Sequence, residues 1–334
     1  MGGGFDSEDL VLHVGPPRTG TTTLQLDVFR GHDEIDLIGK PFDAPLKHGA
    51  SAGSCEAMAA LSDMLWREDG IAFCFDRARA LLTAAADRPR RSGARVRVLS
   101  EEGFGHNGAV DAHVIAKRLR RLFGRCRVLV TVREPVSAAV SYYRWAYTRG
   151  FAEGSLDSWV RARLRRSSYF GRGQDFPLAN ARYGALVELY QRLFGVERVM
   201  VLPLEMLRSD RAAYAGALSG FLGVDGDQIA ALLDHPAKNA SVGRLEAGYQ
   251  RLVKRWQYAR ARRSGQIFTG RPPSHLVSGG VHGPVLGLIR AIDGPQRGLG
   301  EAARGALERY YAPDQALLLR ALARGGPSPE IRES

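Results

Sequence analysis

The chain has 334 residues, a formal net charge of +12 and an isoelectric point close to 10. Apolar residues make up 45% of it and charged residues 25%, which is typical of a globular protein with a substantial buried core. No apolar run approaches the ~18 residues of a membrane span, and the first ten residues, MGGGFDSEDL, lack the basic and apolar regions of a signal peptide. The sequence therefore predicts no transmembrane segment and a cytoplasmic location.

The basic surplus favours anionic partners. Only five lysines occur, so arginine carries most of the positive charge. Such a surface suits nucleotide phosphates, anionic glycans, nucleic acid or acidic lipid. The aromatic interleaving and signature motifs of nucleic-acid-binding modules are absent, so we do not predict a nucleic-acid partner. The three cysteines have neither metal-ligand nor disulfide-framework spacing, and we expect them to be reduced and structural, with no metal bound.

Short apolar runs alternate with helical patterns along the chain. Strands are predicted over residues 10–14, 35–38, 95–100, 127–132 and 198–202. Helices are predicted over residues 21–30, 55–87 with a break near 69–70, 110–123, from 135 onward, 178–193, 241–263 and 301–324, the last as one helix or a pair. We expect loops over 264–300 and a frayed tail after residue 324.

This order of elements predicts an α/β fold with a mostly parallel central sheet flanked by helices, of the P-loop-containing nucleotide-binding type. We expect a single domain over residues 1–334, with its core over about 10–240 and a helical C-terminal extension over about 241–334. Ligands of such a sheet bind beyond the carboxyl ends of its strands, where every motif described below lies. His13, inside the first strand, is interpreted as a core histidine rather than a catalyst.

The segment HVGPPRTGTTTLQ follows the first apolar run and has the outline of a phosphate-binding loop. Gly15 and Gly20 have the spacing of the P-loop pattern, but Thr21 stands where the lysine would be. The backbone N–H groups and dipole of a helix start favour an anion there, and Arg18 offers a planar pair of donors. The loop therefore predicts a nucleotide site without the lysine that reaches the β and γ phosphates of a triphosphate.

The run Pro17-Arg18-Thr19-Gly20-Thr21-Thr22 resembles the 5′-phosphosulfate loop of the sulfotransferases that use 3′-phosphoadenosine 5′-phosphosulfate (PAPS). Arg18 takes the position that a lysine often holds in that family, which keeps the charge. The resemblance implies that residues 18–22 bind PAPS as the donor, that Arg18 also assists catalysis, and that the product is adenosine 3′,5′-bisphosphate (PAP). It implies no metal.

The segment VREPVSAAVSYYRWAY, after the fourth predicted strand, carries a second likeness to the same family. There, R-x-P followed by S-[YF] at this spacing binds the 3′-phosphate of PAPS. Arg133, Pro135, Ser141 and Tyr142 match that pattern. The resemblance therefore implies that Arg133 and Ser141 bind the 3′-phosphate.

The likeness covers about residues 10–225 and continues more weakly through KNASVGR, from Lys238 to Arg244. Better known members of the family carry a third phosphate-binding element in that region. The resemblance therefore implies Lys238 or Arg244 as an additional contact. Lys40, after the second predicted strand, is a further candidate for stabilising charge on the bridging oxygen.

Transfer to a hydroxyl requires a positioned base, which the family places just past the third strand. This chain has VLSEEGFGH there, and the pattern S-x-E-G-F of bacterial members points to Glu102. Glu101 and His106 are the alternatives. Adjacent residues of an extended segment face opposite ways, so only one of the two glutamates can enter the site.

We interpret the chain as a bacterial-type sulfotransferase that moves a sulfuryl group from PAPS to a hydroxyl of a carbohydrate or another small metabolite, by in-line attack with a glutamate base. One alternative is a nucleotide kinase of the P-loop type, for which the lysine and a strand-end aspartate for Mg²⁺ are missing. The other is a basic anion-binding module without catalysis. No pattern ranks glycans, lipids, phenols and peptides as acceptors or indicates an oligomeric state.

Overall fold

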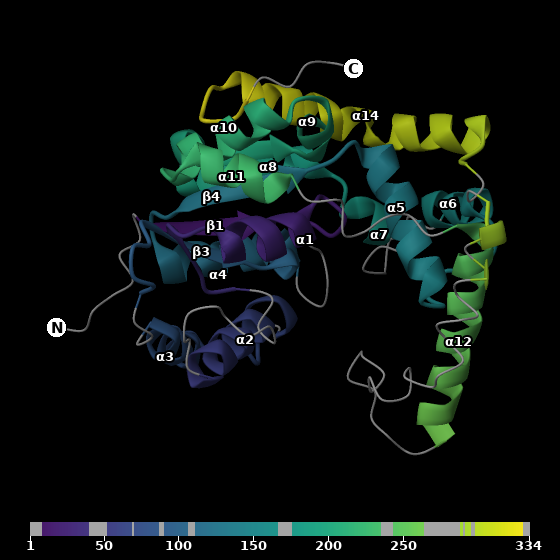
Figure 1. Cartoon of the computed structure of the whole chain (residues 1–334), viewed down its shortest axis with the longest axis horizontal. Helices are drawn as coiled ribbons and strands as arrows, with labels where there is room; N and C mark the ends of the chain where they lie inside the picture. Colours follow the sequence, from purple (N-terminus) through teal and green to yellow (C-terminus); the bar gives the residue numbers. More distant parts are fainter. Residues whose placement is uncertain are drawn as a thin grey trace. The chain divides into compact units, whose positions relative to one another are not determined.

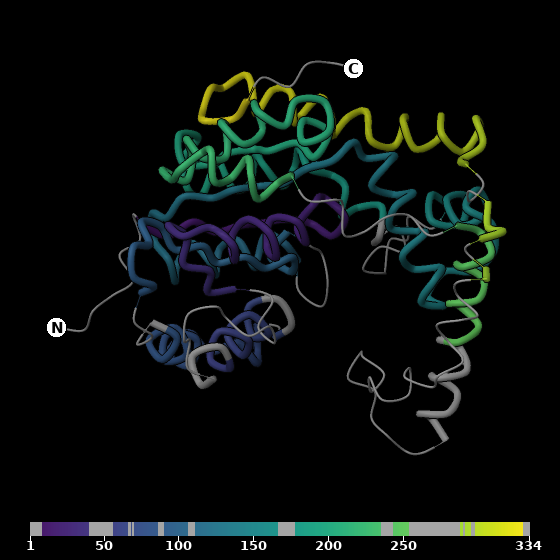
Figure 2. The backbone as a smooth tube through the Cα atoms, in the orientation of Figure 1, coloured from purple at the N-terminus to yellow at the C-terminus, as the bar shows by residue number. Residues whose placement is uncertain are grey.

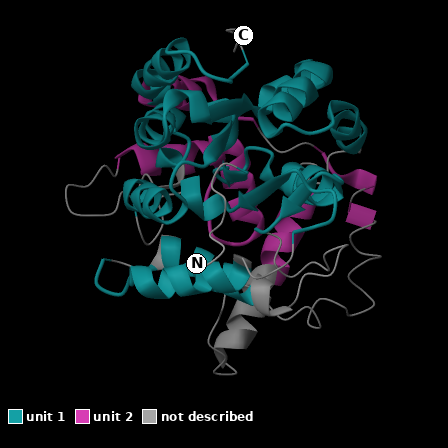
Figure 3. Cartoon of the chain, turned by 90° about the vertical axis from the view of Figure 1, so that its left-hand side faces the viewer, with its two compact units in different colours: residues 1–138, 176–238, 311–334 teal, residues 139–175, 239–310 magenta. Residues whose placement is uncertain are grey.

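The structure is a computed structural model of the chain, whose backbone is traced in Figure 2. It describes residues 9–39, 52–68, 70–86, 90–105, 111–165, 176–234, 243–263, 288–289, 291–294 and 298–329. The described chain divides into two compact units, coloured separately in Figure 3. The first unit is Met1–Ala138, Phe176–Lys238 and Tyr311–Ser334, and the second is Ala139–Asp175 and Asn239–Tyr310. The prediction of a single domain with a C-terminal extension stays a prediction.

The first unit is built on a five-stranded parallel sheet of order β2-β3-β1-β4-β5 (Figure 1). Its strands are β1 Leu10–Val14, β2 Ile35–Leu37, β3 Val96–Ser100, β4 Arg127–Val132 and β5 Val199–Pro203. Nearly all of their residues are buried, as expected for a parallel sheet covered on both faces. The predicted strands and the parallel α/β sheet are therefore confirmed.

Helices connect the strands and cover the sheet. The first unit contains α1 Thr21–Thr23 continuing into the π-helix η1 Leu24–Phe29, α2 Ala52–Arg67, α3 Phe75–Ala86, the 3₁₀ turn η2 Glu102–Gly105, α4 Ala112–Phe123, α7 Phe176–Ala179, α8 Tyr183–Phe194, the 3₁₀ turn η3 Val196–Arg198, α9 Leu204–Ser209, α10 Arg211–Leu222 and α11 Gly226–Leu233. The second unit contains α6 Leu156–Arg165 and α12 Arg244–Arg263. Two helices belong partly to each unit: α5 Pro135–Thr148 and α14 Glu301–Ala323.

The residues of one sheet face alternate along the strands and pack under η1, α10 and α11. Val11, Val98, Leu129 and Met200 contribute to this core from four strands, and Phe29 contributes from η1. The residues between them, such as Leu12 and Val130, are equally buried on the opposite side, where α8 contacts β4 and β5. The sheet is therefore covered on both faces, which is why its strands carry continuous apolar runs rather than alternating ones.

Four predicted segments differ from the structure. The helix predicted over 178–193 is two helices, α7 and α8, separated at residues 180–182. The helix after the loop is of the π type from Leu24 onward. In the tail predicted to fray, the structure describes residues 325–329, and the Ser328 hydroxyl accepts the backbone N–H of Val201 on the edge strand β5 at 2.9 Å. Residues 288–289 and 291–292, in the predicted loop region, are helical.

In the second unit, a carboxylate caps the start of α12. The Asp293 carboxylate accepts the backbone N–H groups of Leu245 and Glu246 at 2.7 and 2.9 Å, which caps the first turn of α12. On α12, Arg251 lies over the ring of Tyr147, 4.6 Å from its centroid. These contacts order the basic helix predicted over 241–263, which the structure places at Arg244–Arg263.

Two of the three cysteines have described side chains, and both are free: Cys74 is exposed and Cys126 is buried. Burial raises the pKa of the Cys126 thiol to about 12, so this side chain stays a neutral apolar core group. The side chain of Cys55 lies outside the described ones.

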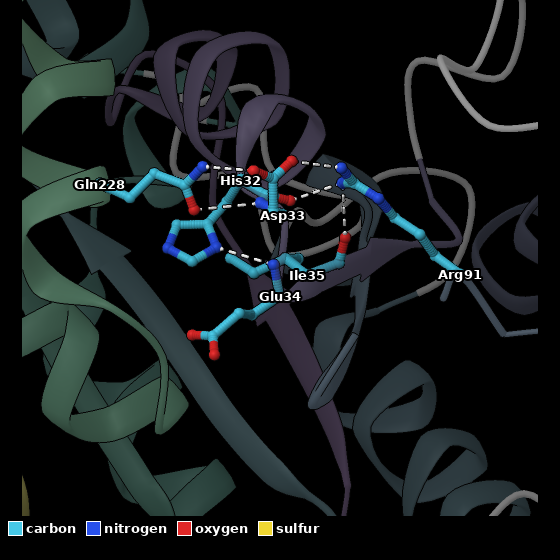
Figure 4. A network of polar contacts seen from close by, with 6 residues as sticks. All are labelled: His32, Asp33, Glu34, Ile35, Arg91 and Gln228. Carbon is cyan, nitrogen blue, oxygen red and sulfur yellow. Dashed lines mark hydrogen bonds and ion pairs between the residues drawn. The ribbon is translucent and has the colours of Figure 1, made fainter. Parts of the chain in front are cut away.

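A polar network fastens the amino ends of β2 and β3, at the edge of the sheet opposite the strand carboxyl ends (Figure 4). His32 is fully buried, and its Nδ1 accepts the backbone N–H of Glu34 at 3.1 Å, so Nε2 carries the proton and donates to the Asp225 carbonyl at 2.9 Å. Arg91 donates to the carbonyl of His32 and to the carboxylate of Asp33, each at 2.6 Å. One histidine and one arginine thus join three chain segments.

We predict that Arg91→Leu lowers the free energy of unfolding by about 1–3 kcal/mol, because the part-buried carbonyls it serves lose their donor. Urea denaturation followed by circular dichroism measures the change. Arg95→Leu is the matched control: it removes a 65% exposed arginine whose ion pair with Glu34 is 3.5 Å long. It should change stability by less than about 1 kcal/mol, and equal losses in the two variants would contradict the role given to Arg91.

Candidate active site

The loop between β1 and α1 holds Arg18 in a conformation that few side chains adopt. Its φ is +79°, and among the described residues it is the one non-glycine with a positive φ. This conformation costs an ordinary residue about 1–2 kcal/mol. Gly20, at φ +88°, has no such cost, and a Cβ there would lie 2.7 Å from Cδ1 of Leu204. The loop therefore keeps an arginine under strain and needs a glycine two residues later.

Two loop threonines use their hydroxyl groups inside the fold. The buried Thr19 hydroxyl donates to the carbonyl of Pro16 at 2.8 Å, so it shapes the loop. The buried Thr21 hydroxyl donates to Oε1 of Glu102 at 2.5 Å. Because Thr21 and Thr22 begin a helix, their backbone N–H groups lack intrahelical acceptors and can meet an anion. Thr21 thus joins the predicted donor loop to the predicted base.

Arg133 directly follows β4 and reaches the loop. Its Nη1 donates to the carbonyl of Arg18 at 3.2 Å, and its Nε is buried without a hydrogen-bond partner among the described residues. Burial lowers the pKa of Arg133, and the nearby charge of Arg208 lowers it further. The neighbouring Glu134 does not pair with it, because that carboxylate accepts the N–H groups of Val136 at 2.7 Å and of the following serine at 2.6 Å. A half-buried guanidinium with spare donors is suited to an anion.

Arg208 is a cationic group that the sequence analysis missed. It lies in α9, just after the end of β5, and is exposed. The positive charge of Arg208 lowers the pKa of Arg133, whereas the negative charge of Glu205 raises it. Neither arginine forms an ion pair within 4 Å with a carboxylate in the described part of the chain. The signal that could have found Arg208 is its position just past a buried strand, in VLPLEMLRSD.

The two glutamates after β3 have different surroundings. Glu102 is half-buried, and its Oε1 meets the Thr21 hydroxyl. Glu101 is 1% exposed, and its Oε1 accepts the backbone N–H of Gly103 at 3.0 Å, which places it within its own turn. The two carboxylates therefore have different partners, and the assignment of the base to Glu102 rather than Glu101 stays a prediction.

Five other predicted site residues lie in the second unit or outside the described residues. Ser141 is in the second turn of α5, in the part that belongs to the second unit, and Arg244 is an exposed residue at the start of α12 in that same unit. Lys40, His106 and Lys238 lie outside the described residues. Their predicted roles stay predictions.

Over the described residues, no group of three or more histidine, cysteine, aspartate or glutamate side chains is arranged to hold a metal ion. None of the described helices combines the length and apolar character that crossing a membrane requires.

Comparison with known proteins identifies the fold. No protein-family model and no curated protein matches the sequence. A crystal structure of a sulfotransferase from Alicyclobacillus acidocaldarius matches with a TM-score of 0.52 and 17% identity, covering 95% of this chain and 96% of that one. The sulfotransferase domain of the Synechococcus PCC 7002 olefin synthase matches at a TM-score of 0.39 and 13% identity over 93% of this chain and 98% of that one. The sulfotransferase domain from the curacin biosynthetic pathway matches at 0.39 and 12% identity over 81% and 96%.

The first of these likenesses extends over nearly the whole of both chains, and it agrees with the five-stranded parallel sheet and its flanking helices. At 17% identity, this likeness shows the backbone arrangement alone. The chain therefore has the α/β fold of a sulfotransferase.

Proposed function

We propose that this chain is a sulfotransferase that takes a sulfuryl group from PAPS and transfers it to a hydroxyl of a carbohydrate or another small metabolite. The observation that carries the proposal is the meeting of its two sequence signatures. Arg133, from the second signature, donates to the carbonyl of Arg18, in the first, although 115 positions separate them. Both residues follow carboxyl ends of strands, and Thr21 of the same loop donates to the candidate base Glu102.

The residues present fit an anionic nucleotide with phosphate groups at two positions. The loop offers Arg18 and the backbone N–H groups of a helix start for the 5′ end of the donor. Arg133 offers a buried Nε for a second phosphate, and Arg208 adds charge beside it. Two like charges held together at one edge are stabilised by an anion between them.

The chemistry supplied by PAPS is an activated sulfuryl group: the acceptor oxygen bonds to sulfur, the bond from sulfur to the bridging oxygen breaks, and PAP leaves. The carboxylate of Glu102 takes the hydroxyl proton of the acceptor. Arg18 and the loop N–H groups stabilise the charge that develops on the bridging oxygen. The excess of arginine agrees with an acceptor that carries negative charge.

Calorimetric titration with PAP, with ADP and ATP as controls, tests the proposal. We expect PAP to bind in preference to both, and Arg133→Met to weaken PAP binding by at least about tenfold, because a charge-assisted contact is lost. Arg211→Met, which removes an arginine of α10 paired with Asp234, is the control and should bind PAP like the wild type. Preference for ATP would favour a kinase, and no nucleotide binding would favour an anion-binding module.

Arg18→Gly separates binding from stability. Glycine adopts the left-handed conformation freely, so the free energy of unfolding should stay within about 1 kcal/mol of the wild type. The loss of the guanidinium should weaken PAP binding by at least about tenfold. Thermal unfolding and calorimetry measure the two effects, and a variant that binds PAP normally would remove Arg18 from the proposed site.

Glu102→Gln tests the base. We expect sulfuryl transfer to fall by about 10²–10⁴-fold, because the amide cannot take the acceptor proton, while PAP binding changes by less than about threefold. A screen with radiolabelled PAPS and a panel of hydroxyl acceptors provides the assay. Glu101→Gln is the paired variant: if it abolishes transfer while Glu102→Gln retains it, the base is Glu101.

A further inference from the structure

Beneath the loop, three adjacent strands bring polar side chains together on one face of the sheet. Ser100 ends β3, His13 lies in β1 and Thr131 lies in β4, and all three are at most 1% exposed. Nδ1 of His13 lies 2.7 Å from the Ser100 hydroxyl, and Nε2 lies 3.3 Å from the Thr131 hydroxyl. The interpretation of His13 as a core residue is correct, but this imidazole links the strands that end in the base turn and in Arg133.

The chain of hydrogen bonds continues at both ends. On one side, Nε2 of Gln25, on η1, donates to the Ser100 hydroxyl at 2.9 Å. On the other side, the Thr131 and Thr19 hydroxyls lie 2.8 Å apart, and Thr19 donates to the carbonyl of Pro16. The first group can only donate and the last can only accept.

These fixed ends determine every proton between them. Thr19 has one hydroxyl proton and gives it to Pro16, so Thr131 must donate to Thr19. Nε2 of His13 must then donate to Thr131, which leaves Nδ1 of the neutral imidazole to accept from Ser100. Burial lowers the pKa of His13 to about 3, so the imidazole stays neutral under ordinary conditions.

We call this chain of hydrogen bonds, from Gln25 through Ser100, His13 and Thr131 to Thr19, the relay. The loop backbone lies directly against it. A Cβ at Gly15 would lie 2.6 Å from the Thr131 hydroxyl and 2.9 Å from Nε2 of His13, so glycine alone fits there. Ser100 is followed at once by the two glutamates, and Thr131 precedes Arg133 by two residues. The relay therefore touches the loop and the two strand ends that carry the other candidate groups.

We propose that His13 is a positioning residue: as a neutral imidazole protonated at Nε2, it holds the loop of residues 15–20 in register with the strand ends that carry Glu102 and Arg133. It acts through Thr131 and Thr19 on one side and through Ser100 on the other, and it does not touch the reacting groups. The geometry of the relay stands by itself, whereas its effect on nucleotide binding rests on the proposed function.

Two substitutions of Thr131 test the relay with a small change of side-chain shape. Thr131→Val keeps the volume and removes the hydroxyl, whereas Thr131→Ser keeps the hydroxyl. In hydrogen–deuterium exchange we expect the amides of residues 15 and 18–22 to exchange at least about tenfold faster in Thr131→Val and within about threefold of wild type in Thr131→Ser. PAP affinity should follow the same order. Equal loop protection in the two variants would overturn the proposal.

His32 provides the matched control. It is as buried as His13 and uses both ring nitrogens, but it lies at the amino ends of the strands. His32→Phe should lower global stability and leave loop exchange and PAP affinity within about threefold of wild type. His13→Phe should change loop exchange and PAP affinity by at least about tenfold each. If both histidine variants loosen the loop equally, His13 is only a stabilising core residue.

The unmodified protein gives an independent measurement, which serves if the variants do not fold. ¹⁵N spectra of the histidine-labelled full chain distinguish the tautomers, and we expect His13 to be protonated at Nε2 alone and to remain so well below pH 6. The opposite tautomer, or titration near pH 6.5, would overturn the relay. If the wild type binds no PAP while the spectra and exchange agree with the relay, the proposed function fails and the positioning of the loop stands.

Discussion

The parallel pairing of β1 with β3 on one side and β4 on the other is the constraint on which the rest of the site depends. Parallel strands bring their carboxyl ends to one edge of the sheet. The strand order β2-β3-β1-β4-β5 makes β1 the point from which the chain first builds one side of the sheet and later the other. Ligands of such folds bind beyond the strand ends at a switch point of this kind, and the loop that follows β1 begins there. Residues from separate parts of the sequence therefore meet without any of them being adjacent in the chain.

The strands and the loop could be predicted because their signals are local. Each strand is a short apolar run, and Gly20 marks a backbone position that needs a positive φ. The break between α7 and α8 could not, because the apolar periodicity runs through it. The two N–H groups at the start of α8, of Gly184 and Ala185, are capped by the carboxylate of Asp314 at 2.8 and 2.9 Å. A cap supplied from 130 positions away leaves no mark beside the helix it begins.

Local and long-range signals also differ within the candidate site. The positions of Arg18 and Arg133 just after strands β1 and β4 could be predicted from the sequence, whereas their binding roles stay predictions. The hydrogen bond from Thr21 to Glu102 and the closeness of Arg208 to Arg133 depend on strand order, which no single segment encodes. The polar residues His13, Ser100 and Thr131 stand out in otherwise apolar strands, but only the register places them on one face. Their connection becomes visible when the strands are paired.

Residues 326–328 cover part of the sheet edge that β5 forms. β5 is an edge strand, and an edge strand presents unpaired backbone groups that can recruit a strand from another molecule. Here the N–H of Val201 is already bound to Ser328, and Gly326 lies so close that a Cβ on it would be 3.0 Å from the carbonyl of Val196. Pro203, which has no N–H, ends the strand. Residues 326–328 thus cover part of this sheet edge, so that addition of a strand from another molecule is disfavoured at Val201.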